Sequence, residues 1–198
     1  MTQEIASFPK KTWETPLHLC LDLNIWCAAL LADRKGKQGT ASQILVEIVK
    51  QGFCNLGPVQ LVISWGMLNR LRWVLEKDFS IPQSTADLYI DAIRGYAEHG
   101  AYGASPQLSL GGTGVIALQD REDAHVLETA LAGRAAVLVT ANFKDFISTK
   151  DAHIILPQQH ANHSTPAHAI YFSPAHKFHI ANTAQMMFWL KSGQIPEI

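Results

Sequence analysis

The stretch VLVTANFKDF, Val137 to Phe146, joins an apolar segment to a polar turn and then to the start of a helix. Residues 135–140 have the apolar, β-branched composition of a buried strand. Thr140 ends this strand, Asn142 follows it, and Asp145 comes three positions later. Ligands of open parallel sheets bind outside the carboxyl ends of the strands, so the segment predicts a functional edge of a sheet.

Similar segments alternate with helical patterns along the rest of the chain. Further strands are predicted over residues 17–24, 60–64, 114–118 and 153–157. Apolar spacing predicts a helix that passes into a basic loop over residues 25–37. It predicts further helices over residues 42–52, 67–75, 82–96, 122–131 and 186–193, with Gly52, Gly133 and Gly193 as stops. This alternation favours the α/β class, as a three-layer fold with a parallel five-stranded sheet and helices on both faces.

The length of 198 residues suits one domain with a substantial core. Residues 1–16 are predicted to be a loose N-terminal lead-in, and residues 17–156 to form the α/β domain. Residues 157–198 are predicted to be a His-rich C-terminal extension that ends in a helix and packs on the same domain. Within this extension, residues 157–182 show no regular pattern and are expected to be irregular.

The charge balance argues against a broad basic surface that grips duplex DNA non-specifically, because 16 Lys and Arg residues face 17 Asp and Glu residues. The odd set of cysteines, Cys20, Cys27 and Cys54, predicts free thiols in a reducing compartment. We find neither an apolar signal-peptide core nor an apolar run long enough to span a membrane. The expectation is therefore a cytoplasmic protein without a membrane partner.

Acidic residues follow three of the predicted strands. Asp22 ends the first, Asp120 and Asp123 follow the segment 114–118, and Asp145 follows the opening stretch. Carboxylates gathered at one edge repel each other, and a divalent cation such as Mg²⁺ or Mn²⁺ removes that repulsion. Each acid alone is better explained as a helix cap or a partner of a helix dipole. Three acids at neighbouring strand ends instead favour a metal site for phosphate chemistry.

The segments that carry these acids resemble the PIN-domain family of metal-dependent ribonucleases, which includes the toxins of many toxin–antitoxin pairs. The resemblance covers residues 17 to about 156 and is carried by LDLNIWCAALL, VISWGMLNRLRWVL and DREDAHVLETALAGRAAVLVTANFKDF. It implies that Asp22, Asp123 and Asp145 are catalytic acids that bind Mg²⁺ or Mn²⁺. It also implies supporting polar residues, which are Asn24, Ser64, Thr140 and Asn142, with Asp120 as an accessory acid.

One position departs from the family pattern. Arg70 stands six residues after Ser64, where the family usually places a metal-binding Glu. A guanidinium does not ligate a cation, but it pairs well with carboxylates. The family likeness thus implies a Mg²⁺- or Mn²⁺-dependent endoribonuclease with an RNA substrate, and an antitoxin protein and a second copy of the chain as candidate partners. The alternative is a catalytically impaired PIN-like module that binds RNA or protein.

Aromatic residues leave a further alternative open. Trp65, Trp73 and Trp189 are suited to stack on nucleobases, although packing in the core or an interface is the more common role. His125 lies two residues past Asp123 and is a candidate for contact with substrate. The alternative is an ordinary position on the helix surface. These choices depend on which side chains are exposed.

Overall fold

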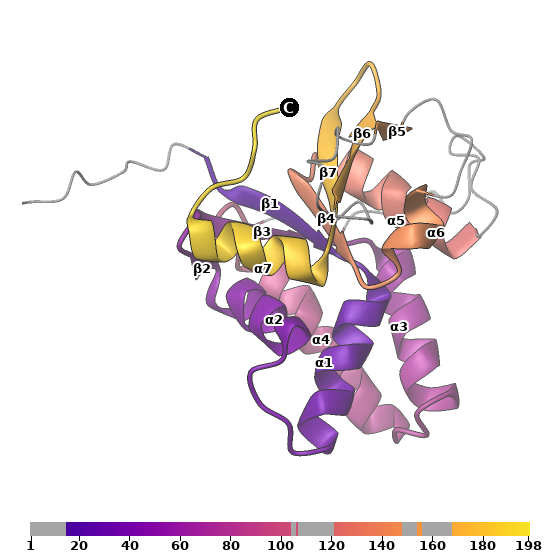
Figure 1. Ribbon diagram of the computed structural model, residues 1–198. Helices are drawn as coiled ribbons and strands as arrows, with labels where there is room; N and C mark the ends of the chain where they lie inside the picture. Colours follow the sequence, from indigo (N-terminus) through magenta and orange to yellow (C-terminus); the bar gives the residue numbers. More distant parts are fainter. Residues whose placement is uncertain (1–14, 104–105, 107–120, 148–153, 156–167) are drawn as a thin grey trace, which may run out of the picture.

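A computed structural model describes residues 15–103, 106, 121–147, 154–155 and 168–198 (Figure 1). Its strands are β1 (Leu17–Leu21), β2 (Phe53–Cys54), β3 (Gly57–Val62), β4 (Val137–Thr140), β5 (Ile154–Ile155), β6 (His168–Phe172) and β7 (Lys177–Asn182). Its helices are α1 (Leu23–Arg34), α2 (Ala41–Gln51), α3 (Trp65–Lys77), α4 (Gln83–Glu98), α5 (Arg121–Ala132), α6 (Phe143–Ile147) and α7 (Thr183–Ser192).

The described strands form one seven-stranded sheet in the order β2-β3-β1-β4-β7-β6-β5. β3, β1, β4 and β7 are parallel, whereas β2, β6 and β5 join the edges antiparallel. The sheet lies between α2 and α7 on one face and α4 and α5 on the other, while α1 and α3 continue from the carboxyl ends of β1 and β3 (Figure 1). The three-layer α/β class is confirmed.

The prediction of five strands that are all parallel is wrong in the number of strands and in their direction. Residues 154–155 form β5, an antiparallel edge strand, and not the fifth parallel strand. β7 instead takes the place beside β4, pairing Val137 with His179 and Thr140 with Asn182. The strand expected over residues 114–118 lies outside the described residues.

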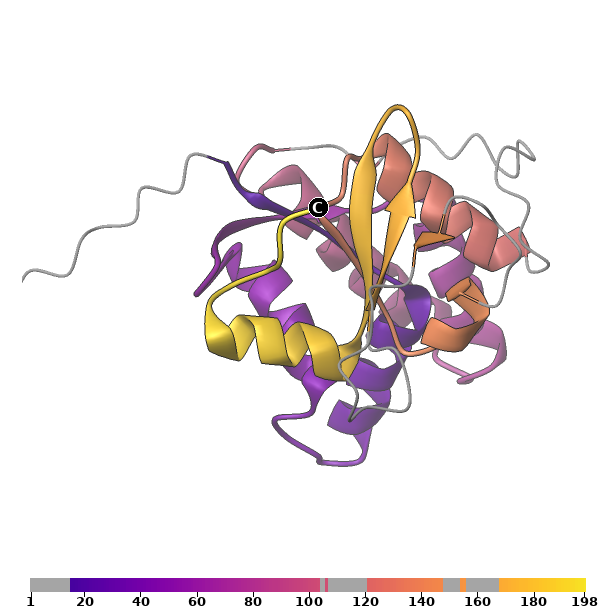
Figure 2. The same ribbon diagram turned by 45° about the horizontal axis from the view of Figure 1, so that its top comes forward.

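The prediction that residues 157–182 are irregular is wrong for residues 168–182, which are the part of this segment that the structure describes. Residues 168–182 form the hairpin of β6 and β7, which stands above the rest of the sheet in Figure 2. Phe178, Ile180 and Ala181 of β7 are fully buried in the common core. The chain after residue 167 therefore supplies a central strand of the sheet as well as α7.

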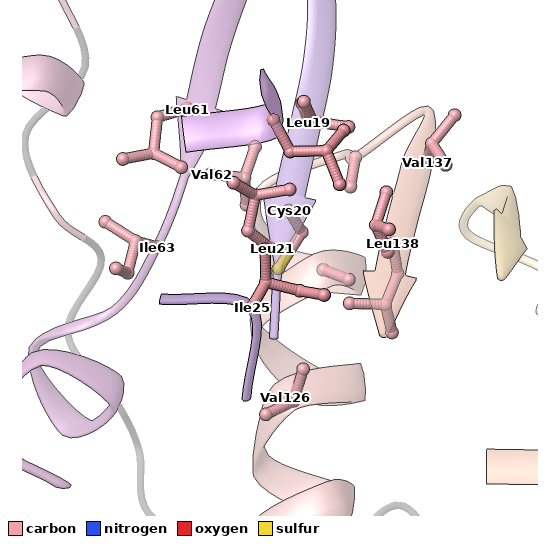
Figure 3. Packing of buried hydrophobic residues seen from close by; sticks show 14 of the residues in the cluster. Leu19, Cys20, Leu21, Ile25, Leu61, Val62, Ile63, Val126, Val137 and Leu138 are labelled. Atoms are coloured by element: carbon pink, nitrogen blue, oxygen red, sulfur yellow. The ribbon is translucent and has the colours of Figure 1, made fainter. Parts of the chain in front are cut away.

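The core explains why the central strands are continuously apolar. All four residues of β4 are buried, as are Leu19, Cys20 and Leu21 of β1. Their side chains meet Ile25 of α1 and Val126 of α5, as Figure 3 shows from close by. Helices cover both faces of these strands, so side chains that point to either face are buried and apolar until the strands end.

Local signals set several helix ends. Thr40 and Gln43 form a capping box at the start of α2, and Gly52 ends this helix with φ +66°. Gly193 ends α7 in the same way, with φ +70°. α1 begins at Leu23, so the first strand is shorter than the predicted segment 17–24. No helix in the described ranges has the length and apolar character required to cross a membrane.

Candidate functional site

The Asp22 carboxylate lies where β1 ends and α1 begins. Its Oδ1 accepts a hydrogen bond from the backbone N–H of Leu23 at 2.6 Å and so caps α1. Its Oδ2 accepts from Asn24 Nδ2 at 2.6 Å and from Thr140 Oγ1 at 2.7 Å. Asp22 is only 5% exposed, so these bonds act away from bulk water and hold the carboxylate in one orientation.

The turn after β4 is fastened to the end of β1. Thr140 is fully buried and donates its hydroxyl to Asp22, while Asn24 Oδ1 accepts from the backbone N–H of Ala141 at 3.0 Å. Asn24 therefore bonds to Asp22 through its amide nitrogen and to the β4 turn through its amide oxygen. β1 and β4 are neighbours in the sheet, which is why residues so far apart in sequence meet here.

Asn142 and Asp145 extend this arrangement toward solvent. The backbone N–H of Asn142 donates to Thr140 Oγ1 at 2.9 Å, and Asn142 Nδ2 donates to Asp145 Oδ2. Both residues are exposed, and Asp145 lies in the first turn of α6. A continuous path of hydrogen bonds thus links Asp22 to Asp145 through Thr140 and Asn142.

A second polar group lies after β3. Ser64 is buried and caps α3 by accepting from the backbone N–H of Met67 at 3.2 Å. Its Oγ lies 3.1 Å from His125 Nε2 and accepts from Thr129 Oγ1 at 3.0 Å. These contacts tie the start of α3 to α5, so His125 has a structural contact and not only a place on the helix surface.

Asp123 lies on α5, the helix that also carries His125. It is half-buried in the first turn of this helix, two residues before His125. The positive end of the helix dipole favours an acid at this position. Asp123 therefore also fits the explanation that a single acid stabilises the start of a helix. Asp120 lies outside the described residues.

Arg70 is half-buried on α3, and its Cζ lies 4.4 Å from the centre of the Trp73 ring. The nearest acids in sequence do not replace the missing Glu. Glu76 Oε1 accepts from Arg72 Nε at 3.0 Å, and Glu47 is exposed on α2. The position that departs from the family pattern is therefore part of a cation–π pair.

Among the residues that the structure describes, no group of three or more His, Cys, Asp or Glu side chains is arranged to hold a metal ion. The chemistry of the candidates does suit a hard cation, because Asp22, Asp123 and Asp145 offer carboxylate oxygens. Both oxygens of Asp22 already accept hydrogen bonds.

The charge of Asp22 also acts on two neighbouring thiols. Burial first, and then the negative charge of Asp22, raise the pKa of Cys20. The same causes, with a contribution from Asp78, raise the pKa of Cys27 to about 11. Both thiols are therefore neutral near pH 7, and Cys20, Cys27 and Cys54 are free cysteines, as predicted.

One polar residue at this edge was missed from the sequence. Asn182 ends β7 beside Thr140 and caps α7, accepting from the backbone N–H of Gln185 at 2.7 Å. The available signal was the largely apolar segment 178–181, which includes His179, followed by an Asn ahead of a helical pattern. With Asp22 and Ser64, Asn182 brings a third capped helix start to the carboxyl ends of the parallel strands.

Comparison with known proteins identifies the fold family. A family model described as the PIN domain matches residues 18–144, well over half of the chain. No curated protein and no solved structure matches the chain. The matched range includes all but the first residue of β1, together with β3, α3, α5 and β4, and it stops one residue before Asp145. The chain therefore belongs to the PIN domain family, whose members are generally nucleases that use divalent metal ions.

Proposed function

We propose that this protein is a metal-dependent endoribonuclease in which Asp22, Asp123 and Asp145 hold Mg²⁺ or Mn²⁺. The observation that carries the proposal is the buried Asp22 carboxylate, oriented by three hydrogen-bond donors at the carboxyl end of a central parallel strand. Burying a carboxylate is unfavourable unless it is paired, so its retention at a ligand-binding edge favours a functional role.

The surrounding residues position this acid and its neighbour. Thr140 and Asn24 hold Asp22, and Asn142 holds Asp145 from the same turn. A bound cation would supply a water molecule of lowered pKa and would stabilise the charge that develops on the attacked phosphodiester. The starts of α1 and α3 lie at this edge, and the positive ends of their dipoles favour a phosphate there.

The proposal requires the carboxylates to approach one another when the cation binds. Without a cation, like charges disfavour such an approach, which agrees with the absence of a three-ligand group among the described residues. The same observation, together with Arg70 at the usual Glu position, favours a second candidate function. In that alternative, the protein is a catalytically impaired module that binds RNA or protein.

The experiment compares RNA cleavage by the wild-type protein, Asp22→Asn and the control Asp91→Asn, with Mg²⁺, with Mn²⁺ and with a chelator. Asn is also a good helix cap, so α1 should still begin at its present residue. We expect Asp22→Asn to lose at least about 100-fold in rate, because it loses a metal ligand. Asp91 is an exposed residue of α4 that pairs with Arg94, so its variant should cleave normally.

Cation binding measured by calorimetry separates the two functions. A wild-type protein that neither cleaves RNA nor binds Mn²⁺ at millimolar concentration contradicts the nuclease, and retained RNA binding then favours the impaired module. Circular dichroism of each variant shows whether a lost rate reflects lost folding.

A toxin role in the cytoplasm, silenced by a cognate antitoxin protein, and a homodimeric state are the finer parts of this proposal. Their support is the family resemblance. A small reading frame beside the gene, whose product abolishes the RNase activity, supports the toxin role, and light scattering of the purified protein tests the dimer.

A further inference from the structure

The outer face of α3 carries an unusual combination of side chains for a solvent-exposed helix. Met67, Leu68, Leu71 and Leu75 form the buried face. At about 100° per residue, Asn69, Trp73 and Lys77 fall on the opposite face, with Arg70 at its border. Trp73 is 45% exposed, so a large aromatic surface lies where a polar residue is expected.

Arg70 fixes the orientation of this aromatic side chain. The guanidinium carbon lies 4.4 Å from the Trp73 ring centre, which is within the range of a cation–π interaction. A stacked guanidinium lowers the conformational freedom of the indole before any ligand arrives. The three tryptophans considered as stacking candidates from the sequence differ in exposure: Trp189 is buried, Trp65 is half-buried, and Trp73 is exposed.

The pair lies close to the candidate site. Ser64 caps α3 at the carboxyl end of β3, and Arg70 follows six residues later, about 9 Å along the helix axis. Long side chains of a helix lean toward its N-terminus, so Arg70 leans toward the edge that holds Asp22 and Ser64. Trp73 follows Arg70 by three residues, so a chain of nucleotides that leaves this edge along α3 would reach its ring after about 13 Å.

The charges around Trp73 suit a polyanion. Arg70 and Lys77 flank it on the same face, four or fewer residues away. The nearest acid of the helix, Glu76, is neutralised by Arg72 at 3.0 Å, and Arg72 also pairs with Asp87 at 2.8 Å. Single-stranded nucleic acid binding commonly combines basic side chains for phosphates with aromatic rings for bases.

We propose that Trp73, stacked on Arg70, is a base-stacking subsite that binds an unpaired nucleobase of RNA next to the scissile phosphate. This subsite rests on the proposed function and names how the RNA is held. It also gives Arg70 a role at the position where the family usually has a Glu: the side chain binds substrate instead of metal.

The test is fluorescence anisotropy with a short labelled single-stranded RNA, in a chelator that prevents metal-dependent cleavage. Trp73→Ala should raise Kd by about 5- to 150-fold, the range for loss of one base–aromatic stack. Trp73→Phe keeps an aromatic face and should recover most of the affinity. Phe188→Ala removes another exposed aromatic residue, 63% exposed on α7, and should leave Kd unchanged.

A duplex of the same sequence is the second arm, because its bases are already stacked on each other. Duplex affinity should not depend on Trp73. An equal loss for single strand and duplex would overturn base stacking, and an unchanged Kd of Trp73→Ala for the single strand would overturn the subsite. In cleavage assays, the loss should appear mainly in KM.

The results distinguish an error in the proposed subsite from an error in the proposed nuclease activity. If the wild type cleaves RNA and Trp73→Ala binds it as tightly, the subsite is wrong and the nuclease stands. If the wild type neither binds nor cleaves single-stranded RNA, both proposals fail together.

Discussion

Thr140 donates its hydroxyl hydrogen to Asp22 at 2.7 Å, across 118 positions of the sequence. Both residues are buried, and the bond joins the ends of two neighbouring parallel strands. The bond has a structural effect because it satisfies a buried charge, and it positions the acid on which the proposed chemistry depends. A variant of this pair must therefore be tested both for its free energy of unfolding and for its rate of RNA cleavage.

Thr140→Val keeps the shape of the side chain but removes the hydroxyl. Asp22 Oδ2 then loses the Thr140 donor, and Asn142 loses the acceptor of its backbone N–H. We expect the free energy of unfolding to fall by about 1–3 kcal/mol, measured by urea denaturation. Thr85→Val, at an exposed position of α4, is the control and should change stability by less than about 0.5 kcal/mol.

Two glycines near the end of α4 should respond to alanine in opposite directions. A Cβ at Gly100 would lie 2.6 Å from Gln60 Oε1, and this buried side chain also holds Tyr102 N–H at 2.9 Å and Ala97 O at 2.9 Å. Gly100→Ala should therefore destabilise by about 1–2 kcal/mol. Gly95 has no atom within 4 Å of its Cβ position and lies inside the helix, so Gly95→Ala should stabilise by about 0.5–1 kcal/mol.

Thermal unfolding of the two single variants checks this pair under identical conditions. An unchanged or raised melting temperature for Gly100→Ala would show that Gln60 moves aside without losing its hydrogen bonds, and a lowered one for Gly95→Ala would contradict the helix-propensity argument.

Stability should fall when the pH is lowered below about 6.5. Burial lowers the pKa of His179 below its ordinary value of 6.5, and burial together with His179 lowers the pKa of His168. The unfolded chain then binds protons at a higher pH than the folded one, so stability is complete above pH 6.5 and is lost progressively below it. Urea denaturation between about pH 7.5 and 5 measures the slope.

His179→Gln tests the source of this slope. His179 Nε2 donates to the Pro196 carbonyl at 3.0 Å, and an amide nitrogen of Gln is able to make the same bond without titrating. We expect a smaller loss of stability on acidification than in the wild type. His99→Gln, which removes an exposed histidine, is the control, and an equal slope in all three proteins would exclude His179 as the cause.

Cys27 should resist alkylation in the folded protein. Burial and the charges of Asp22 and Asp78 raise its pKa to about 11, so very little thiolate is present at pH 8. Iodoacetamide should modify it roughly 100-fold more slowly than in the same chain unfolded in urea. Mass spectrometry of the peptide follows the rate, and equal rates in both states would mean that the thiol is accessible and normally acidic.

The sequence by itself determined the elements whose signals are local. The spacing of apolar residues predicted α3, α4 and α5, and glycines predicted the ends of α2 and α7. The apolar runs that become β1, β3 and β4 end in polar residues, which predicted Asp22, Ser64 and Thr140 as strand-end positions. These features depend on backbone geometry and on neighbours within a few residues, so they are visible in one dimension.

The tertiary structure decided which of these segments meet. It placed β7 beside β4 and brought Asn182 next to Thr140, although the sequence pattern predicts an irregular segment over residues 157–182. It exposed Trp73 and buried Trp189, and it joined Thr140 to Asp22. Strand pairing over such separations depends on how the whole set of helices covers both faces of the sheet, and the period of a short segment carries no information on that arrangement.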